Sequence, residues 1–251
     1  MSKLQELKTH LADVLHLQHA AAILSWDQQT YMPPSGAEAR AEQLATLSRL
    51  AHEMFVADAT GTLLQQAAAE VDGAAYDSDD AALVRVVQHD YDLATRVPTK
   101  LVEEIARTTT LAHEVWAKAR QENDFNSFAP MLDKIYDLMR QQADALGYED
   151  RMYDALLDQY EPGMKTAQVE TLFAELREEL VPFVAAIFER LDAVDDTPVK
   201  RHYAIDKQAE FGLKVIERLG YDMTRGRQDK AVHPFTTSFS INDVRITTRY
   251  E

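Results

Sequence analysis

The chain has 251 residues, 46% of them hydrophobic, with only eight glycines and eight prolines. This composition excludes a collagen-like protein or a flexible linker, and the length suits one or two folded domains. Because 42 Asp and Glu against 26 Lys and Arg give a formal charge of −16, which repels phosphate backbones, we expect no nucleic-acid partner.

The first predicted helix runs from Ser2 to the residues before Met32. Its apolar residues recur at spacings of three and four, and Ser2 with Gln5 has the capping-box pattern. Pro33 and Pro34 end this helix because proline lacks a donor and disfavours helical geometry in its predecessor. Ser35 with Glu38 predicts a second capping box.

The N-terminal segment also bears on location. Residues 1–11 lack the apolar run and cleavage site of a secretion signal, and no stretch of about 18 consecutive apolar residues occurs in the sequence. We therefore expect a cytoplasmic protein that neither enters nor spans a membrane.

Caps, prolines and apolar spacing predict further helices along the chain. They run from residue 35 through Met54, through Leu63 and Leu64, from Ser78 through Leu93, from Pro98 through Trp116, from Pro130 to Gly147, from Tyr148 to Tyr160, from Thr166 to about Val194 with a kink at Pro182, and from Asp206 to Leu219.

A β-hairpin is predicted near the end of the sequence, because residues 233–239 and 244–250 are rich in β-branched and aromatic side chains. A two-stranded ribbon is only marginally stable, so we expect an open strand edge and a last 20 or so residues that are held poorly unless a partner covers them. The expected fold is therefore all-α and bundle-like with a short C-terminal β-hairpin, divided into a helical domain at 1–220 and a hairpin segment at 221–251.

No local motif completes a metal site or another catalytic centre. The lack of cysteine excludes thiolate zinc ligands and a cysteine nucleophile. His16 and His19 lie one turn apart without an acid at a zincin-like spacing, which favours histidines on the helix surface or in interhelical hydrogen bonds over metal ligands. The segments beginning His113-Glu114 and His52-Glu53 start like H-E-x-x-H but have Ala117 and Val56 in the fifth position.

Three groups of segments carry a family resemblance over essentially the whole chain. The first is ILSWDQQTYMPP at residues 23–34, which continues into GAEAR at 36–40. The second is YDALL at 153–157 with YEPG at 160–163, and the third is HPF at 233–235 with DVRIT at 243–247. Together they resemble the carboxypeptidase Taq family of metallocarboxypeptidases, including its HPF and D-x-R-x-T motifs.

The resemblance implies a zincin-type, mostly helical enzyme, usually a homodimer with a deep groove, that releases single amino acids from peptide C-termini with zinc or cobalt. In that family the H-E-x-x-H helix and the distal glutamate ligand follow the D-x-R-x-T segment, and members are about twice this length. We therefore expect an N-terminal half with no catalytic residue and no metal ligand, inactive alone. The alternative is a non-catalytic helical module that dimerises or pairs with a separate C-terminal half.

For substrate binding, the matched motifs indicate His233, Asp243, Arg245 and Thr247. Asp243 and Arg245 share a strand face, where Arg245 could offer its planar fork to a carboxylate and Asp243 could anchor it or accept a peptide amide. The alternative is an ion pair that only fixes the hairpin. His233 either hydrogen-bonds in the groove or metal shell, or simply packs.

In the N-terminal signature, we expect Trp26 and Asp27 to be structural. The ring would fill a corner after the first helix, and the carboxylate would cap free amides.

Overall fold

The computed structural model describes residues 1–250, which form two compact units. Residues 1–146 and 222–249 make the first unit, and residues 147–221 make most of the second. The predicted mostly helical fold is confirmed, whereas the division expected between residues 220 and 221 stays a prediction. Within residues 1–250, no helix is both long enough and apolar enough to cross a membrane.

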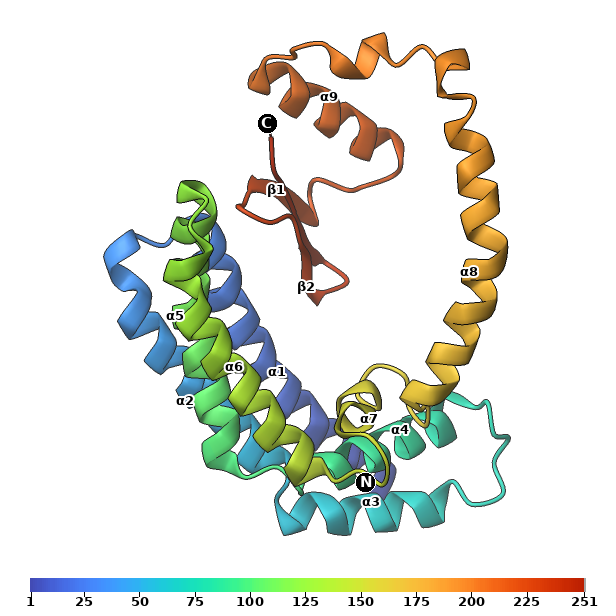
Figure 1. The fold of residues 1–251 in the computed structure, drawn as a ribbon. Helices are drawn as coiled ribbons and strands as arrows, with labels where there is room; N and C mark the ends of the chain where they lie inside the picture. The colour runs from blue at the N-terminus through green and yellow to red at the C-terminus, as the bar shows by residue number, and fades with distance from the viewer. Residues whose placement is uncertain (251) are drawn as a thin grey trace. The chain divides into compact units, whose positions relative to one another are not determined.

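The first unit is built on four helices that run side by side (Figure 1). These are α1 (Lys3–Thr30), α2 (Ala37–Phe55), α5 (Thr99–Glu122) and α6 (Phe125–Leu146). Two further helices, α3 (Asp58–Glu70) and α4 (Asp79–Ala94), pack on one another, and α3 also packs on α1.

Two kinds of packing hold these helices together. Leu7 of α1 and Leu64 of α3 are fully buried in a cluster with Ala67 and Val84. Between the long helices many buried positions are alanines, which let the backbones approach closely. These alanines are Ala41, Ala45 and Ala51 of α2, Ala112 and Ala119 of α5, and Ala143 of α6.

The predicted starts at Ser2 and Ser78 are confirmed, whereas those of α2, α6 and α7 (Met152–Leu157) differ, with α7 beginning at Met152 rather than Tyr148. Ser2 and Ser78 accept hydrogen bonds from the helix amides three residues on, as N-caps do. Ser35 does not cap α2, because residues 34–36 form a 3₁₀ turn and Gly36 occupies the cap position. Similarly α6 begins at Phe125, before Pro130, because Asp124 accepts from the amide of Ser127 and serves as the cap.

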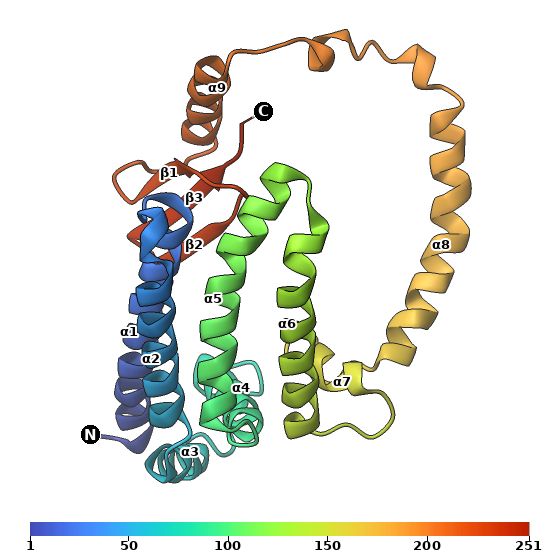
Figure 2. The same cartoon turned by 60° about the vertical axis from the view of Figure 1, so that its left-hand side comes forward.

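The C-terminal part of the first unit is a three-stranded sheet, shown against α1 in Figure 2. The predicted hairpin is present as β2 (Thr236–Ser240) antiparallel to β3 (Asp243–Thr248), but a third strand, β1 (Gly226–Lys230), pairs parallel with the other edge of β3. The sheet order is therefore β1-β3-β2. The expectation of a two-stranded ribbon was wrong, because β1 pairs with the edge of β3 that the hairpin alone would leave open, and α1 contacts β2.

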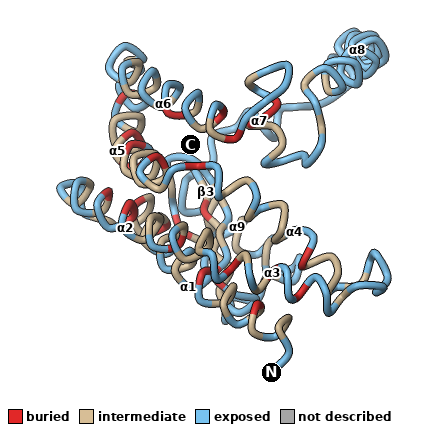
Figure 3. Tube along the Cα trace, turned by 90° about the horizontal axis from the view of Figure 1, so that it is seen from below, coloured by how far each residue is buried: buried red, intermediate tan, exposed pale blue. Residues whose placement is uncertain are grey.

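The second unit contains α7 (Met152–Leu157), α8 (Thr166–Phe188) and α9 (Ile205–Arg218). Within residues 147–221, only Asp154 and Ala155 are buried. The carboxylate of Asp154 accepts hydrogen bonds from the amide and hydroxyl of Thr166, which ties α7 to the start of α8. The rest of α8 lies exposed, as its pale colour in Figure 3 shows, and it ends six residues earlier than predicted.

Substitutions should distinguish the two units. We expect Leu64→Ala to lower the free energy of unfolding by about 2–5 kcal/mol, since it opens a cavity among fully buried side chains. The matched change Leu172→Ala, at a residue of α8 that is 55% exposed, should cost about 0.5 kcal/mol or less. Urea unfolding followed by circular dichroism measures both, and equal costs would contradict the packing described.

Candidate functional site

The predicted D-x-R-x-T residues lie on the central strand of the sheet. Asp243, Arg245 and Thr247 alternate along β3 and therefore share one of its faces. Arg245 donates from Nε to Oδ1 and from Nη2 to Oδ2 of Asp243, both at 2.9 Å. This two-point contact lowers the pKa of the Asp243 carboxyl, which stays ionised at neutral pH. The structure thus brings two of the predicted residues together as an ion pair that orients the guanidinium.

The guanidinium of Arg245 also lies over two aromatic rings. Its Cζ is 4.2 Å from the ring centroid of Trp26 in α1 and 4.9 Å from that of Phe239 in β2. Both rings are buried, and such cation–π contacts strengthen where water is excluded. Trp26 was expected in a corner after the first helix, but it lies inside α1 and forms the base on which Arg245 rests.

A second arginine–aspartate pair lies on the neighbouring strand β1. Arg227 donates from Nε and Nη2 to the two carboxylate oxygens of Asp229, each at 2.7 Å. The strand register sets Arg227 beside Arg245 and Asp229 beside Thr247. Tyr31, just after α1, donates its hydroxyl to Asp229 and accepts a hydrogen bond of 2.8 Å from Arg227. The sheet is therefore joined to the end of α1 through β1 and through β3.

Burial and pairing fix the charges in this second group. Burial alone would raise the pKa of Asp229, but the hydrogen bonds from Arg227 and Tyr31 outweigh it, so the pKa is lowered. The hydrogen bond to Asp229 in turn raises the pKa of the Tyr31 phenol. At neutral pH the group consists of a buried carboxylate held by a cation and a neutral hydroxyl.

The other two predicted residues have different environments. Thr247 is buried, and its Oγ1 accepts from the amide of Phe235 at 2.7 Å and donates to the carbonyl of Phe235 at 3.0 Å. This side chain joins the H-P-F segment to the D-x-R-x-T strand. His233 lies exposed in the segment between β1 and β2.

Residues of the N-terminal signature hold the helix that carries Trp26. Asp27 does not cap free amides as expected, since its Oδ2 accepts from Nη2 of Arg40 in α2 at 2.6 Å. Arg40 donates a second hydrogen bond to the carbonyl of Leu24. These contacts fix the last turns of α1 against α2, and with them the position of Trp26.

The histidines of the first unit do not assemble a metal site. The ring of His19 packs edge-on against Phe239, with 6.5 Å between centroids. Burial lowers the pKa of His52, which also has a backbone hydrogen-bond contact with Val97. Among residues 1–250 no group of three His, Cys, Asp or Glu side chains could hold a metal ion, so the residues present do not fit the divalent metal that the family resemblance implies.

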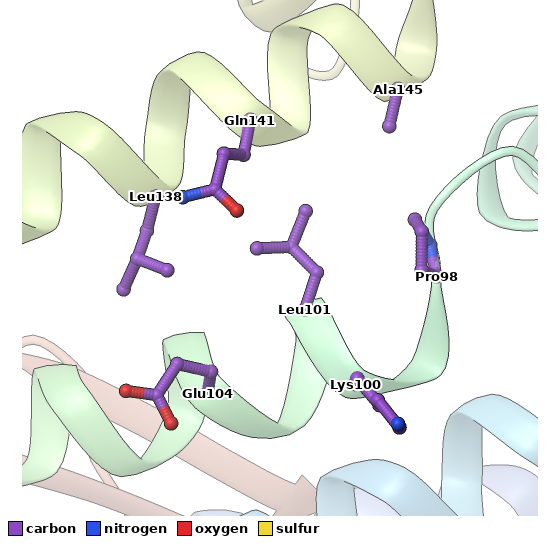
Figure 4. Close-up of a pocket in the computed structure, with 7 residues that line it drawn as sticks. All are labelled: Pro98, Lys100, Leu101, Glu104, Leu138, Gln141 and Ala145. Carbon is purple, nitrogen blue, oxygen red and sulfur yellow. The ribbon is translucent and has the colours of Figure 1, made fainter.

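A hollow of about 340 Å³ between α5 and α6 is a weaker candidate (Figure 4). Its one carboxylate, Glu104, is engaged by Lys134 at 2.6 Å and Arg107 at 3.1 Å. The hydrogen bond from Lys134 lowers the pKa of Glu104, which therefore serves as a structural anion. The hollow is lined by Pro98, Lys100, Leu101, Glu104, Leu138, Gln141 and Ala145.

Sequence reasoning missed three of the residues around Arg245. Arg227 and Asp229 lie on β1, whose sequence GRQDK has no β-branched or aromatic residue and therefore was not predicted as a strand. Tyr31 belongs to the quoted signature but had no role assigned. The usable signal was the R-x-D spacing at 227–229, which repeats the D-x-R spacing of 243–245 in reverse.

Comparisons with known proteins agree with these motifs. The sequence model described as carboxypeptidase Taq (M32) metallopeptidase matches residues 6–251. Thermostable carboxypeptidase 1 of Pyrococcus furiosus is 37% identical over 93% of this chain and 46% of its own length. Thermostable carboxypeptidase 1 of Thermus thermophilus is 35% identical over 98% of this chain and 50% of its own length. The BsuCP crystal structure, at 30% identity, superposes with a TM-score of 0.92 over all of this chain and 50% of that one.

The family match and the superposition therefore define a metallopeptidase-type helical scaffold with a short sheet. The chain belongs to the carboxypeptidase Taq (M32) metallopeptidase family. It spans about half the length of the curated relatives it matches.

The lowered pKa of Asp229 predicts an acid-sensitive contribution to stability. This contribution is present above the ordinary aspartate value of 3.8 and is lost as the pH falls through the lower pKa of the folded state. Asp229→Asn should remove it, so that stability falls less steeply below about pH 4. Tyr31→Phe should remove part of it, because one donor to the carboxylate is lost. The urea midpoint of unfolding, measured between pH 5 and pH 2, tests this prediction. If the midpoint of Asp229→Asn falls with pH as steeply as that of the unchanged protein, the prediction is refuted.

Proposed function

We propose that this chain is the N-terminal portion of a metal-dependent carboxypeptidase that releases single amino acids from peptide C-termini. The observation that carries the proposal is the oriented guanidinium of Arg245 within the D-x-R-x-T motif of a family of carboxypeptidases. The names of the curated relatives, both thermostable carboxypeptidases, support the same activity.

The chemistry of Arg245 suits the recognition of a peptide terminus. A guanidinium has five N–H donors, and Asp243 engages Nε and Nη2, so Nη1 keeps its donors for another acceptor. A peptide C-terminus is a carboxylate, the planar acceptor that arginine binds best. The side chain of Arg245 retains 18% exposure, which leaves it within reach of a ligand.

The four predicted binding residues take different parts in this proposal. Arg245 binds the substrate carboxylate, Asp243 orients Arg245, and Thr247 holds the H-P-F segment in register with the strand. His233 contacts the peptide from the exposed segment before β2. The assignments of Arg245, Asp243 and Thr247 rest on the family motif together with the contacts described above, and that of His233 rests on the motif and its exposure.

The metal belongs to polypeptide outside this chain in our proposal. The family implies a divalent metal, and we propose zinc or cobalt. Residues 1–250 do not provide a fitting ligand set, so this chain's own residues bind and position the peptide. Without the ion and its ligands, positioning residues alone should give no useful rate.

The complete enzyme, in this proposal, works as a homodimer in the cytoplasm. The dimer follows the usual state of the family that the motifs resemble. The lack of cysteine supports a reducing compartment, where disulfides do not persist.

Activity assays test the proposal directly. The chain alone, supplied with zinc or cobalt, should release no amino acid from a test peptide. Joined through its C-terminus to the second half of the Pyrococcus furiosus relative, it should release C-terminal residues in a metal-dependent way. Turnover by the chain alone would contradict its incompleteness, and an inert joined protein with both halves folded would contradict the activity.

A substitution in the joined protein tests the role of Arg245. Arg245→Gln should lower kcat/KM by about 10- to 150-fold, the loss expected for a hydrogen bond between charged groups. Arg225→Gln is the matched control, because that exposed arginine pairs with Asp222 in the turn before β1. Equal kcat/KM in the two variants would remove Arg245 from substrate binding.

A further inference from the structure

The long helix of the second unit carries a continuous apolar stripe that faces solvent. Its members recur at spacings of one, three and four residues, which places them within about 100° of the helix surface. Each is between 46% and 63% exposed, and the stripe comprises Leu172, Phe173, Leu176, Leu180, Phe183 and Ile187.

The other positions of α8 carry all of its acidic side chains, together with a few apolar ones, Val181 and Phe188 among them. Glu178 lies on the opposite side of the helix together with Thr171, whereas Glu175 and Glu179 flank the stripe. A helix divided in this way forms stably when its apolar face is covered, because packing rather than helix propensity supplies most of its stability. Exposed apolar stripes of this size mark sites of interaction.

The second unit itself cannot cover the stripe. Within residues 147–221 only Asp154 and Ala155 are buried, and both lie on the short helix α7. Neither α8 nor α9 contains a buried residue. The covering surface must therefore be supplied by polypeptide other than this unit.

The comparisons point to a polypeptide that could cover the stripe. All of this chain, α8 included, has a counterpart in structures of twice its length, and the other half of those chains lies outside the match. A second copy of this chain is a poorer occupant, because each copy has a charge of −16 and α8 itself adds acidic side chains beside the stripe.

We propose that the apolar stripe of α8 is the docking face for the polypeptide that forms the second half of the carboxypeptidases this chain matches. The inference rests on the proposed function and adds the surface through which the two halves assemble. The partner must present aliphatic and aromatic side chains to the stripe. Basic side chains beside them would pair with Glu175 and Glu179, which flank the stripe.

Hydrogen exchange measured by mass spectrometry tests the proposal without catalysis. The samples are the chain alone and the chain joined to the second half of the Pyrococcus furiosus relative. Joining should slow exchange of the α8 amides by about 100-fold or more, whereas amides of α2 and α5 should change little. Unchanged exchange in α8 would overturn the proposal.

Two matched variants of the joined protein locate the contact. Leu176→Asp places a charge in the stripe and should reduce the protection of α8 by about 30-fold or more, as expected for a central interface residue. Thr171→Asp places the same charge on the opposite side and should leave the protection as it was. Equal effects of the two variants would overturn the assignment of the stripe.

Two further measurements separate a failure to fold, or a dimer of this chain, from the proposed docking. If the joined protein does not fold, the intact Pyrococcus furiosus relative replaces it, with aspartate at the position aligned with Leu176 and the same expected loss of protection. Analytical ultracentrifugation of the chain alone should show a monomer. If it shows a dimer that the Leu176→Asp substitution dissociates, a second copy of this chain occupies the stripe, and the proposal is overturned. A joined protein with protected α8 but no peptidase activity would contradict only the proposed function.

Discussion

The stacking of the Arg245 guanidinium on Trp26 is the interaction on which the candidate site depends. It joins the last strand of the sheet to the end of the first helix, with 4.2 Å between the guanidinium carbon and the ring centroid. Asp243 fixes the plane of the guanidinium from the strand side, and Arg40 holds the turn of α1 that carries Trp26. The orientation of one side chain is therefore determined by the last strand together with the first two long helices, which lie about 200 residues earlier in the sequence.

The arrangement also sets two arginines side by side on a protein that is strongly negative. Arg227 and Arg245 lie side by side in register on β1 and β3, and each is paired with an aspartate two residues away. Pairing keeps two neighbouring cations from repelling one another while leaving some of their N–H donors directed elsewhere. In the proposed function, a donor of Arg245 that Asp243 does not engage binds the carboxylate of a peptide C-terminus.

The sequence predicted most of the helices because their determinants are local. Apolar spacing, the Ser2 and Ser78 caps and the prolines act within a few residues, and these helices lie where expected. Strand β1 could not be predicted, since the polar segment GRQDK is a strand only because β3 offers it hydrogen bonds. The contact of Tyr31 with Asp229 likewise joins residues that no local pattern relates. The D-x-R spacing did predict the ion pair, because alternation on a strand is itself a local property.

The two units differ in how completely they are packed. The first has a buried core that extends to its sheet, whereas the second has an exposed apolar helix and almost no interior. The chain spans about half the length of its relatives, and the docking face proposed for α8 accounts for this contrast.

The central claim is that Trp26 and Arg245 stabilise one another. A double-mutant cycle of Trp26→Leu and Arg245→Met, with unfolding measured in urea, isolates that interaction from the other contacts of both residues. The account predicts a coupling free energy of about 0.5–2 kcal/mol that favours the native pair. Additive effects of the two substitutions would contradict it.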